Sequence, residues 1–166
     1  MGFLSQEQLE DMKFKSLGVN VKISDKASIY NSDQMEIGDH SRIDDFCVVS
    51  GRVKIGRNVH IAIFCNVAGG EKGIHLEDFS GLAYGCHVIT QSDDYSGKTL
   101  TNPTVPDEFK LEKKAPVIIG RHSIIGTGSV VLPGVVLGEG TSVGALSMIT
   151  KSMMCAHRSL ASVDLL

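Results

Sequence analysis

The chain has 166 residues, enough for a single domain with a sizeable core, and its formal net charge is −3. Charged residues are interspersed rather than gathered in basic blocks, so the sequence gives no indication of a nucleic-acid partner. It contains neither a signal-peptide pattern nor an apolar run long enough to cross a bilayer, so we expect no membrane insertion.

Residues 1–18 differ from the rest of the chain and predict a short helical cap. Ser5 followed by Gln8 is the pattern of a capping box, in which the two side chains close a helix N-terminus reciprocally. A helix of about ten residues would gather four apolar side chains on one side: Leu4, Leu9, Met12 and Phe14. We expect this segment to cover one open end of the structure that follows.

From residue 19 to residue 155 an aliphatic residue returns at intervals that are mostly six. The clearest stretch is 117–150, VIIGRHSIIGTGSVVLPGVVLGEGTSVGALSMIT. A period of six is typical of a short strand followed by a tight turn, which is the hexapeptide signature of a parallel β-helix. An ordinary β-sandwich would instead alternate with period two. Glycine follows several of the aliphatic residues directly, as at Gly120 and Gly138, where we expect φ values that a Cβ would penalise.

The repeat assigns one inward aliphatic side chain to each strand. Before residue 117 these are Ile23, Ile29, Ile37, Ile43, Val49, Ile55, Ile61, Val67, Leu76, Leu82 and Val88. Two steps are longer than six, and the glycine-rich segment AGGEKG in the second predicts a corner loop. One long excursion, the loop 89–116, interrupts the repeat. About seventeen repeats, taken three to a turn, predict an all-β fold of about six coils, roughly 25–30 Å tall.

The four cysteines show no paired spacing and no metal-ligand spacing. Cys47, Cys65 and Cys86 occupy the small position two residues before an inward aliphatic, where a thiol acts as a small hydrophobe, and Cys155 also fits the register. We therefore expect no metal and a reduced, cytoplasmic compartment.

The residue before each inward position points outward, so these residues can be sorted by face. The first face carries Lys22, Arg42, His60, Gly81, Ile124 and Ser142; the second carries Ser28, Val48, Asn66, His87, Val130 and Met148; the third carries Glu36, Lys54, His75, Ile118 and Val136. The lower coils are charged outside and the upper coils are apolar outside. An exposed apolar patch on flat strands predicts a subunit interface, and a three-sided prism favours a homotrimer.

The segments IIGRHSIIGTGSVVLPGV and VGALSMITK resemble the hexapeptide-repeat acyltransferases, above all the sugar O- and N-acetyltransferases of the galactoside and polysaccharide-biosynthesis type. The resemblance covers residues 19–151, and the loop sequence SDDYSG…LTNPTVP is similar to a subgroup that acylates surface polysaccharides or nucleotide sugars. It implies a left-handed β-helix, a homotrimer and acetyl-CoA bound between two subunits. The implied acceptor is a small-molecule sugar or nucleotide-sugar.

The same resemblance implies where the acyl donor lies. The pantetheine arm would run along backbone groups of stacked coils, at Gly126 and Thr127 and, one coil above, at Gly144 and Ala145. Thr127 and Ala145 are 18 residues apart, which is one full turn of the repeat, so they should stack. The pair Thr150 and Lys151 matches the family's Thr-Lys pair, whose lysine would meet the CoA phosphates as a point charge.

Many family members carry a histidine in the long loop, which deprotonates an acceptor hydroxyl because its pKa lies near the working pH. Here Ser92, Asp93 and Asp94 occupy that place. The remaining candidates for a catalytic residue are His60 and His87, which are predicted to point outward, and Asp93 or Asp94, acting directly or by orienting a histidine. An amine acceptor would need no strong base, because a neutral amine already attacks a thioester. Oxygen and nitrogen acceptors both stay open.

The long loop also offers groups suited to a sugar. Tyr95 and Asn102 can donate and accept hydrogen bonds, while Pro103 and Pro106 stiffen the segment. Loops of this length in compact folds are usually functional. We expect this one to wall the acceptor pocket against a neighbouring subunit.

Two features favour an alternative function, a non-catalytic trimeric scaffold or a degenerate acyltransferase. The loop lacks the usual histidine, and the tail 156–166 lacks the glycine and proline that relatives carry after the Thr-Lys pair. A γ-type carbonic anhydrase would need three histidines converging on zinc, whereas His60, His75 and His87 are predicted on three different faces.

Overall fold

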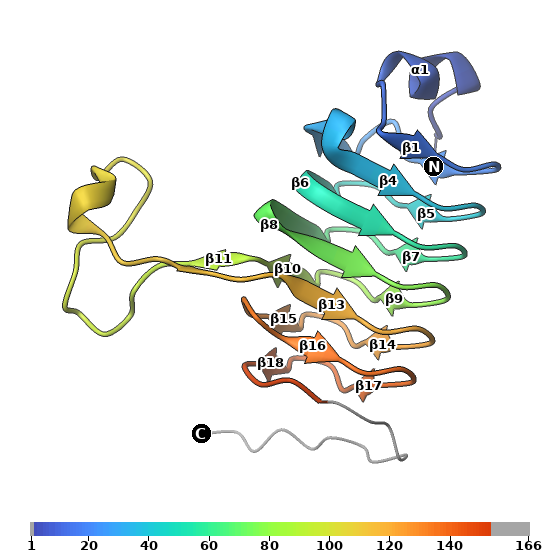
Figure 1. Cartoon of the computed structure of the whole chain (residues 1–166). Coiled ribbons are helices and arrows are strands. Elements are labelled where there is room, and N and C mark those ends of the chain that lie inside the picture. The colour runs from blue at the N-terminus through green and yellow to red at the C-terminus, as the bar shows by residue number, and fades with distance from the viewer. Residues whose placement is uncertain (1, 154–166) are drawn as a thin grey trace.

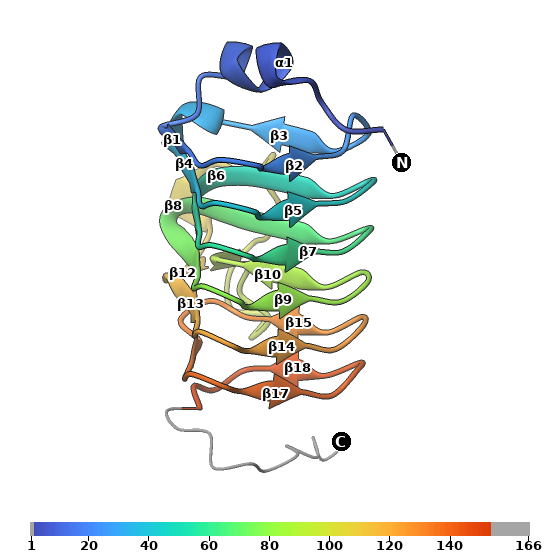
Figure 2. The same cartoon turned by 90° about the vertical axis from the view of Figure 1, so that its right-hand side faces the viewer.

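The computed structural model of the chain describes residues 2–153, so Cys155 and the tail 156–166 lie outside the described residues. Apart from an antiparallel pair in the long loop, the described strands stack in parallel into a three-sided prism, with α1 (Gln6–Asp11) at one end (Figures 1 and 2). Coils near α1 are called lower and coils near residue 153 upper, the reverse of their order in the figures. The parallel β-helix predicted from the six-residue period is confirmed.

The first face is a sheet of six short strands. In stacking order these are β2 (Lys22–Ile23), β5 (Arg42–Ile43), β7 (His60–Ile61), β9 (Gly81–Leu82), β14 (Ile124–Ile125) and β17 (Ser142–Val143). The register pairs His60 with Arg42 of the preceding coil and with Gly81 of the following coil, as the sorting of outward residues predicts.

The second and third faces share two long strands that run around a corner, β6 (Val48–Ile55) and β8 (Asn66–Leu76). The second face adds β3 (Ser28–Tyr30), β10 (His87–Ile89), β15 (Val130–Val131) and β18 (Met148–Ile149). The third adds β1 (Ser16–Leu17), β4 (Met35–Ile37), β13 (Val117–Ile119) and β16 (Val136–Leu137). The predicted outward pairings on both faces are confirmed, for example His87 with Val130 and His75 with Ile118.

The extra residues of AGGEKG bulge at a corner, as predicted, but they do so within a strand rather than as a separate loop. These residues belong to β8 and pair with β6 through an irregular register that includes Gly51 and Gly70. Every departure from period six occurs at this corner between the second and third faces, including η1 (Ser32–Gln34) and the long loop. The extra residues are therefore accommodated without disturbing the first face.

The core contains two inward positions per strand, not one. The expected aliphatics are buried, and so are the residues two positions earlier, which on the third face are large: Met35, Val53, Ile74, Val117 and Val135. On the other faces this position holds smaller residues, namely serine, threonine, cysteine, alanine or valine, and some of the serines bond the next coil. The Ser41 hydroxyl donates to the Gly56 carbonyl at 2.7 Å, for instance, and accepts from the Val59 N–H at 3.0 Å.

The glycines that directly follow inward aliphatics do not adopt positive φ, contrary to the sequence interpretation. Positive φ occurs two residues later, as at His122, Gly128 and Leu146. A Cβ on Gly120 would lie 2.6 Å from the Leu137 carbonyl oxygen, and one on Gly126 would lie 2.5 Å from the Ala145 nitrogen. These glycines are needed because the backbones of successive coils approach closely there.

The N-terminal segment packs on the first coil. α1 begins with the predicted capping box, in which the Gln8 N–H donates to Ser5 Oγ at 3.2 Å and the Ser5 N–H donates to Gln8 Oε1 at 2.8 Å. The helix has six residues, fewer than the ten expected. Leu9 is buried against the core, and the Leu4 N–H donates to the Ile23 carbonyl at 2.9 Å.

The long loop leaves the prism between β10 and β13 and projects away from it (Figure 1). Its stem is an antiparallel pair, β11 (Gln91–Ser92) with β12 (Lys113–Lys114), and η2 (Asp107–Phe109) lies near its far end. Glu112 lies within ion-pair distance of both Lys110, at 3.5 Å, and Lys114, at 3.0 Å. Thr90 anchors the stem to the prism by donating to the Gly69 carbonyl at 2.8 Å.

Candidate active site

A groove of about 470 Å³ runs along the first face and contains one of the two candidate histidines. Its floor is formed by His60, Gly81 and Ile124 from three stacked strands, and Thr127 lines its upper end. Pockets of this volume are large enough for a small ligand or part of a large one. His60 and Thr127, predicted for different roles, therefore share one groove.

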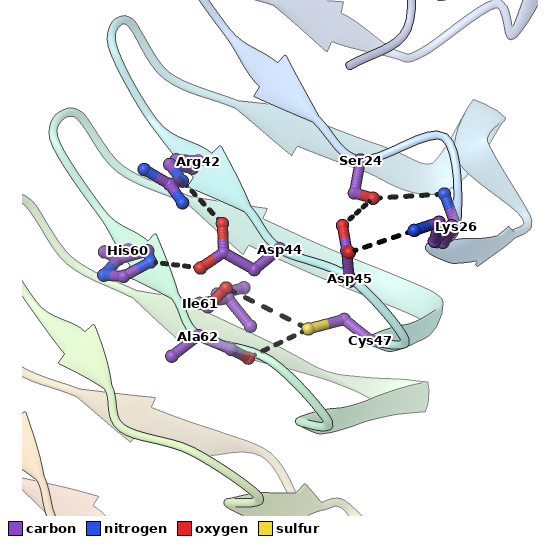
Figure 3. A network of polar contacts seen from close by, with 9 residues as sticks. All are labelled: Ser24, Lys26, Arg42, Asp44, Asp45, Cys47, His60, Ile61 and Ala62. Atoms are coloured by element: carbon purple, nitrogen blue, oxygen red, sulfur yellow. Dashed lines mark hydrogen bonds and ion pairs between the residues drawn. The ribbon is translucent and has the colours of Figure 1, made fainter. Parts of the chain in front are cut away.

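His60 is held by a buried carboxylate. His60 Nε2 lies 2.8 Å from Asp44 Oδ2, and Arg42 Nε lies 2.5 Å from Asp44 Oδ1 (Figure 3). The Asp44 side chain is only 4% exposed, whereas that of His60 is 51% exposed. Asp44 therefore fixes the ring orientation and leaves the rest of the imidazole open to the groove.

Sequence reasoning missed Asp44. The sequence did contain a signal. Asp44 directly follows the inward Ile43, whereas the equivalent position in the upper coils of the same face is glycine, at Gly126 and Gly144. The adjacent Asp45 turns the other way, where it accepts from Ser24 Oγ at 2.5 Å and lies 3.6 Å from Lys26 Nζ (Figure 3). Only the first of the two aspartates serves the histidine.

Aromatic residues wall the groove along one edge. The Phe79 and His122 rings stack with centroids 5.2 Å apart and planes 9° apart. Both residues have positive φ, near 60°, a conformation that costs a bulky residue free energy. Tyr84 lines the opposite edge and is 58% exposed. Exposed rings in strained backbone indicate a surface shaped for contact rather than for stability.

His87 lies on the second face and does not join His60. It is exposed between Asn66 and Val130 in the neighbouring coils, and among residues 2–153 its side chain has no hydrogen-bond partner. The structure therefore distinguishes the two histidines, because only His60 has a carboxylate behind it.

The two loop aspartates have different surroundings. Asp94 accepts from the Ser96 N–H at 2.8 Å, from Ser96 Oγ at 2.8 Å and from Thr99 Oγ1 at 3.0 Å. These bonds, with the Ser96 N–H first, lower the pKa of Asp94. Within residues 2–153, the Asp93 carboxylate accepts a hydrogen bond only from the Asn102 N–H, at 3.4 Å. Asp94 therefore organises the loop turn, and Asp93 is the carboxylate with more capacity to meet a ligand.

The predicted sugar contacts also lie in this loop. Tyr95 is 91% exposed. Asn102 has a φ of 78°, and its Oδ1 accepts from both the N–H and the hydroxyl of Thr104. Among the described residues, no loop residue lines the first-face groove of the same chain.

The residues predicted for the acyl donor stack at the upper corner of the first face. The Leu146 N–H donates to the Thr127 carbonyl at 2.7 Å, and Ala145 packs directly over Gly126. Two hydroxyls, from Ser129 and Ser147, already bond the Gly144 carbonyl. Within residues 2–153 the Gly144 and Ala145 N–H groups have no acceptor, so they can donate to a ligand. Thr150 and Lys151 are exposed at the same end.

Neither a metal centre nor a membrane span is found in the described part of the chain. No three His, Cys, Asp or Glu side chains of residues 2–153 lie close enough together to hold an ion. His60, His75 and His87 belong to β7, β8 and β10, on three different faces. Within the same residues, no helix has the length and apolar character needed to cross a bilayer.

Comparison with known proteins gives a consistent result. A family model described as bacterial transferase hexapeptide (six repeats) matches residues 116–151. The dTDP-4-amino-4,6-dideoxy-D-glucose acyltransferase of Escherichia coli is 43% identical over 90% of this chain and 79% of its own length. This chain is a member of the hexapeptide-repeat acyltransferase family. The left-handed β-helix implied by the resemblance is the fold of this family.

Two further relatives show how the family varies. AntD, an N-acyltransferase from Bacillus cereus solved with dTDP and 3-hydroxybutyryl-CoA, superposes with a TM-score of 0.91 at 47% identity, covering 92% of this chain and 82% of AntD. The galactoside O-acetyltransferase of Lactococcus lactis is 31% identical over 59% of this chain and 46% of its own length. This hexapeptide-repeat protein is thus more similar to the Escherichia coli dTDP-aminosugar acyltransferase and to the Bacillus cereus N-acyltransferase than to the O-acetyltransferase.

Proposed function

We propose that this protein transfers an acyl group from acyl-CoA to the amino group of a dTDP-linked aminosugar. The observation that carries the proposal is the 43–47% identity, over nine-tenths of the chain, to a dTDP-aminosugar acyltransferase and an N-acyltransferase. The donor is proposed to be acetyl-CoA or a slightly longer acyl-CoA, and the setting is proposed to be surface-polysaccharide biosynthesis in the cytoplasm.

The loop chemistry supports nitrogen rather than oxygen as the acceptor atom. A hydroxyl must lose its proton to attack a thioester, whereas a neutral amine carries a free lone pair. The loop offers Asp93 and Asp94 instead of an imidazole, and hydrogen bonds within the loop engage Asp94. Asp94 is therefore a weak base, because these bonds lower its pKa, and Asp93 is the carboxylate left to orient an amine.

The site is proposed to form between subunits of a homotrimer. The long loop projects away from the prism (Figure 1), and within residues 2–153 no loop residue lines the first-face groove of the same chain, so a loop of one subunit would close the groove of another. The amine would attack the thioester carbonyl to form the C–N bond of the amide, the C–S bond would break, and the proton from the attacking nitrogen would pass to the departing CoA sulfur. The N–H groups of Gly144 and Ala145, which have no acceptor among residues 2–153, are suited to hold the pantetheine arm.

A thermal-shift experiment tests the donor half of this proposal. A ligand that binds only the folded state at 100 times its Kd stabilises that state by about 2.7 kcal/mol. We expect acetyl-CoA or 3-hydroxybutyryl-CoA to raise the Tm clearly and adenosine to leave it unchanged. Absence of any shift at millimolar acyl-CoA would contradict the proposal and favour the alternative, a non-catalytic scaffold.

A further inference from the structure

A second groove lies on the third face, below the root of the long loop. It has a volume of about 520 Å³ and extends from η1 and β4 across β6 and β8 to β13. Pro116, which links the loop stem to β13, forms part of its wall. Its inner surface is partly apolar, with Val53, Ile74 and Ile118 among the lining residues. None of the site residues expected from the sequence lies here.

The groove has an excess of positive charge. Four cationic side chains line it, Lys15, Arg52, Lys54 and Lys72, against two carboxylates, Asp33 and Glu36.

One of these carboxylates is already neutralised by its neighbours. Glu36 lies 2.6 Å from Lys15 and 4.0 Å from Lys54, and the hydrogen bond from Lys15 lowers its pKa. Within residues 2–153, neither Arg52 nor Lys72 has a carboxylate within ion-pair distance. Arg52 and Lys72 are therefore available to an anion.

His75 adds a neutral donor to the groove. Burial, followed by the charge of Lys54, lowers its pKa, so the ring is uncharged near neutral pH. The groups facing it are Lys54 below, Glu36, and Glu77 and Asp78 further along the same coil. A neutral imidazole in the same groove as Arg52 and Lys72 can donate one hydrogen bond without adding to their mutual repulsion.

We propose that this groove binds the diphosphate of a nucleotide. The planar Arg52 guanidinium can bond two phosphate oxygens at once, and Lys72 can meet the second phosphate as a point charge. The volume suits a nucleotide rather than a lone phosphate. This inference rests on the proposed function, in which both substrates carry a diphosphate: the dTDP-sugar and the adenine nucleotide of CoA.

The position of the groove assigns it to the acceptor. The N–H groups available to pantetheine, and Lys151, lie at the far end of the prism, on the upper coils. The third-face groove instead adjoins the loop that carries Asp93, Tyr95 and Asn102. A dTDP moiety held by Arg52 would extend its sugar toward that loop.

Charge-removal variants test the assignment. Arg52→Gln and Lys72→Gln should each raise the KM for the dTDP-aminosugar by about 10- to 100-fold, since a hydrogen bond to a charged group is lost, and should leave the KM for acyl-CoA within about twofold. Arg52→Lys should recover part of the loss. Lys26→Gln, which removes an exposed lysine near Asp45, is the matched control and should change neither KM. Calorimetry with dTDP alone should show the tightest binding for wild type and Lys26→Gln, weaker binding for Arg52→Lys, and the weakest binding for Arg52→Gln and Lys72→Gln.

The outcomes separate the possible sources of the phosphate. If the KM for acyl-CoA rises instead, the groove holds the CoA nucleotide and the acceptor assignment is wrong. If dTDP binds wild type and Arg52→Gln equally, or if the variant loses its oligomeric state rather than its affinity, the groove is not a nucleotide site. Wild type that binds dTDP through Arg52 yet forms no acylated product would support the groove and contradict the proposed function.

Discussion

Single residues in this fold are constrained mainly by the distance between coils. Gly126 and Gly144 occupy equivalent positions one coil apart, yet their surroundings differ. A Cβ on Gly126 would lie 2.5 Å from the Ala145 nitrogen, whereas among residues 2–153 the nearest atom to a Cβ on Gly144 is Ser147 Oγ at 4.0 Å. Within the described residues, the backbone of the next coil therefore excludes a side chain at Gly126 but not at Gly144.

This contrast predicts unequal effects of the same substitution. Gly126→Ala should lower the free energy of unfolding by about 1–3 kcal/mol, because a backbone atom cannot move aside as a side chain could. Gly144→Ala should change it by less than about 0.5 kcal/mol. Chemical denaturation of both variants measures the difference in the free energy of unfolding. Equal destabilisation would contradict the view that close approach of the next coil is what requires glycine at position 126.

A second prediction at this scale concerns the acid–base groups. If the acceptor is an amine, His60→Gln, His87→Gln and Asp93→Asn should each lower kcat by less than about tenfold, because no protein base is required for attack. Removal of a true general base typically lowers the rate by about 10²- to 10⁴-fold. Steady-state kinetics with saturating substrates decides between these results. A loss of the larger size for His60→Gln alone would indicate hydroxyl chemistry with Asp44 orienting the base.

The long loop is the element that departs most from the repeat. Its stem, its ion pairs around Glu112 and its Asp94-centred turn give it internal structure, and Thr90 joins it to the prism. Because these contacts are local, we expect the loop to be dispensable for folding.

Deletion tests this independence. Replacing residues 92–112 with a short glycine-serine linker should abolish acyl transfer and leave the circular dichroism spectrum and the oligomeric state unchanged. The prism should fold because the coils below and above the loop pair directly, through β8 with β10 and β13. A deletion variant that keeps its activity would show that the loop takes no part in the site.

The Asp94 turn gives the loop a defined pH response. The pKa of Asp94 is lowered by its hydrogen bonds, chiefly from the Ser96 N–H, so the folded loop favours the carboxylate. Its contribution to loop order is present above the ordinary aspartate pKa and is lost as the pH falls through the lowered value. We expect the Ser96 amide to be protected from hydrogen exchange at pH 5, after correction for intrinsic rates. The Asp94→Ala variant should lose this protection, and protection equal to that of wild type would exclude the capping role.

At the scale of the molecule, the upper coils are apolar on the outside and the lower coils are charged. Ile124 is 48% exposed on the first face and Met148 is 61% exposed on the second. A lone prism would leave these side chains in water, so they indicate burial against other subunits.

Charge insertion tests the proposed trimer. Ile124→Glu should shift the sedimentation profile toward monomer and reduce activity, because it places a carboxylate in the apolar contact. Val19→Glu, at a more exposed position on the lowest coil (62%, against 48% for Ile124), is the control and should stay trimeric. A trimer that tolerates both substitutions would mean that the upper coils face solvent.

The sequence predicted the stacking of outward residues and the position of the long loop, because both follow from counting in sixes. It did not reveal why Gly126 must be glycine, since that depends on the distance between coils rather than on local φ. Nor did it reveal Asp44 or the Arg52 groove. Those groups meet through stacking of residues 16 or more positions apart, and their side-chain directions are set by tertiary contacts. The register was periodic and therefore predictable, whereas the chemistry of the site was not.

The most direct test of the account is to identify the product formed from acetyl-CoA and dTDP-4-amino-4,6-dideoxyglucose. We expect mass spectrometry to show the nucleotide sugar heavier by one acetyl group. Resistance of the product to mild alkali should identify an amide, and the 4-hydroxy analogue of the sugar should give no product. An alkali-labile ester, or acylation of the hydroxy sugar at a comparable rate, would contradict the assignment of this protein as an N-acyltransferase.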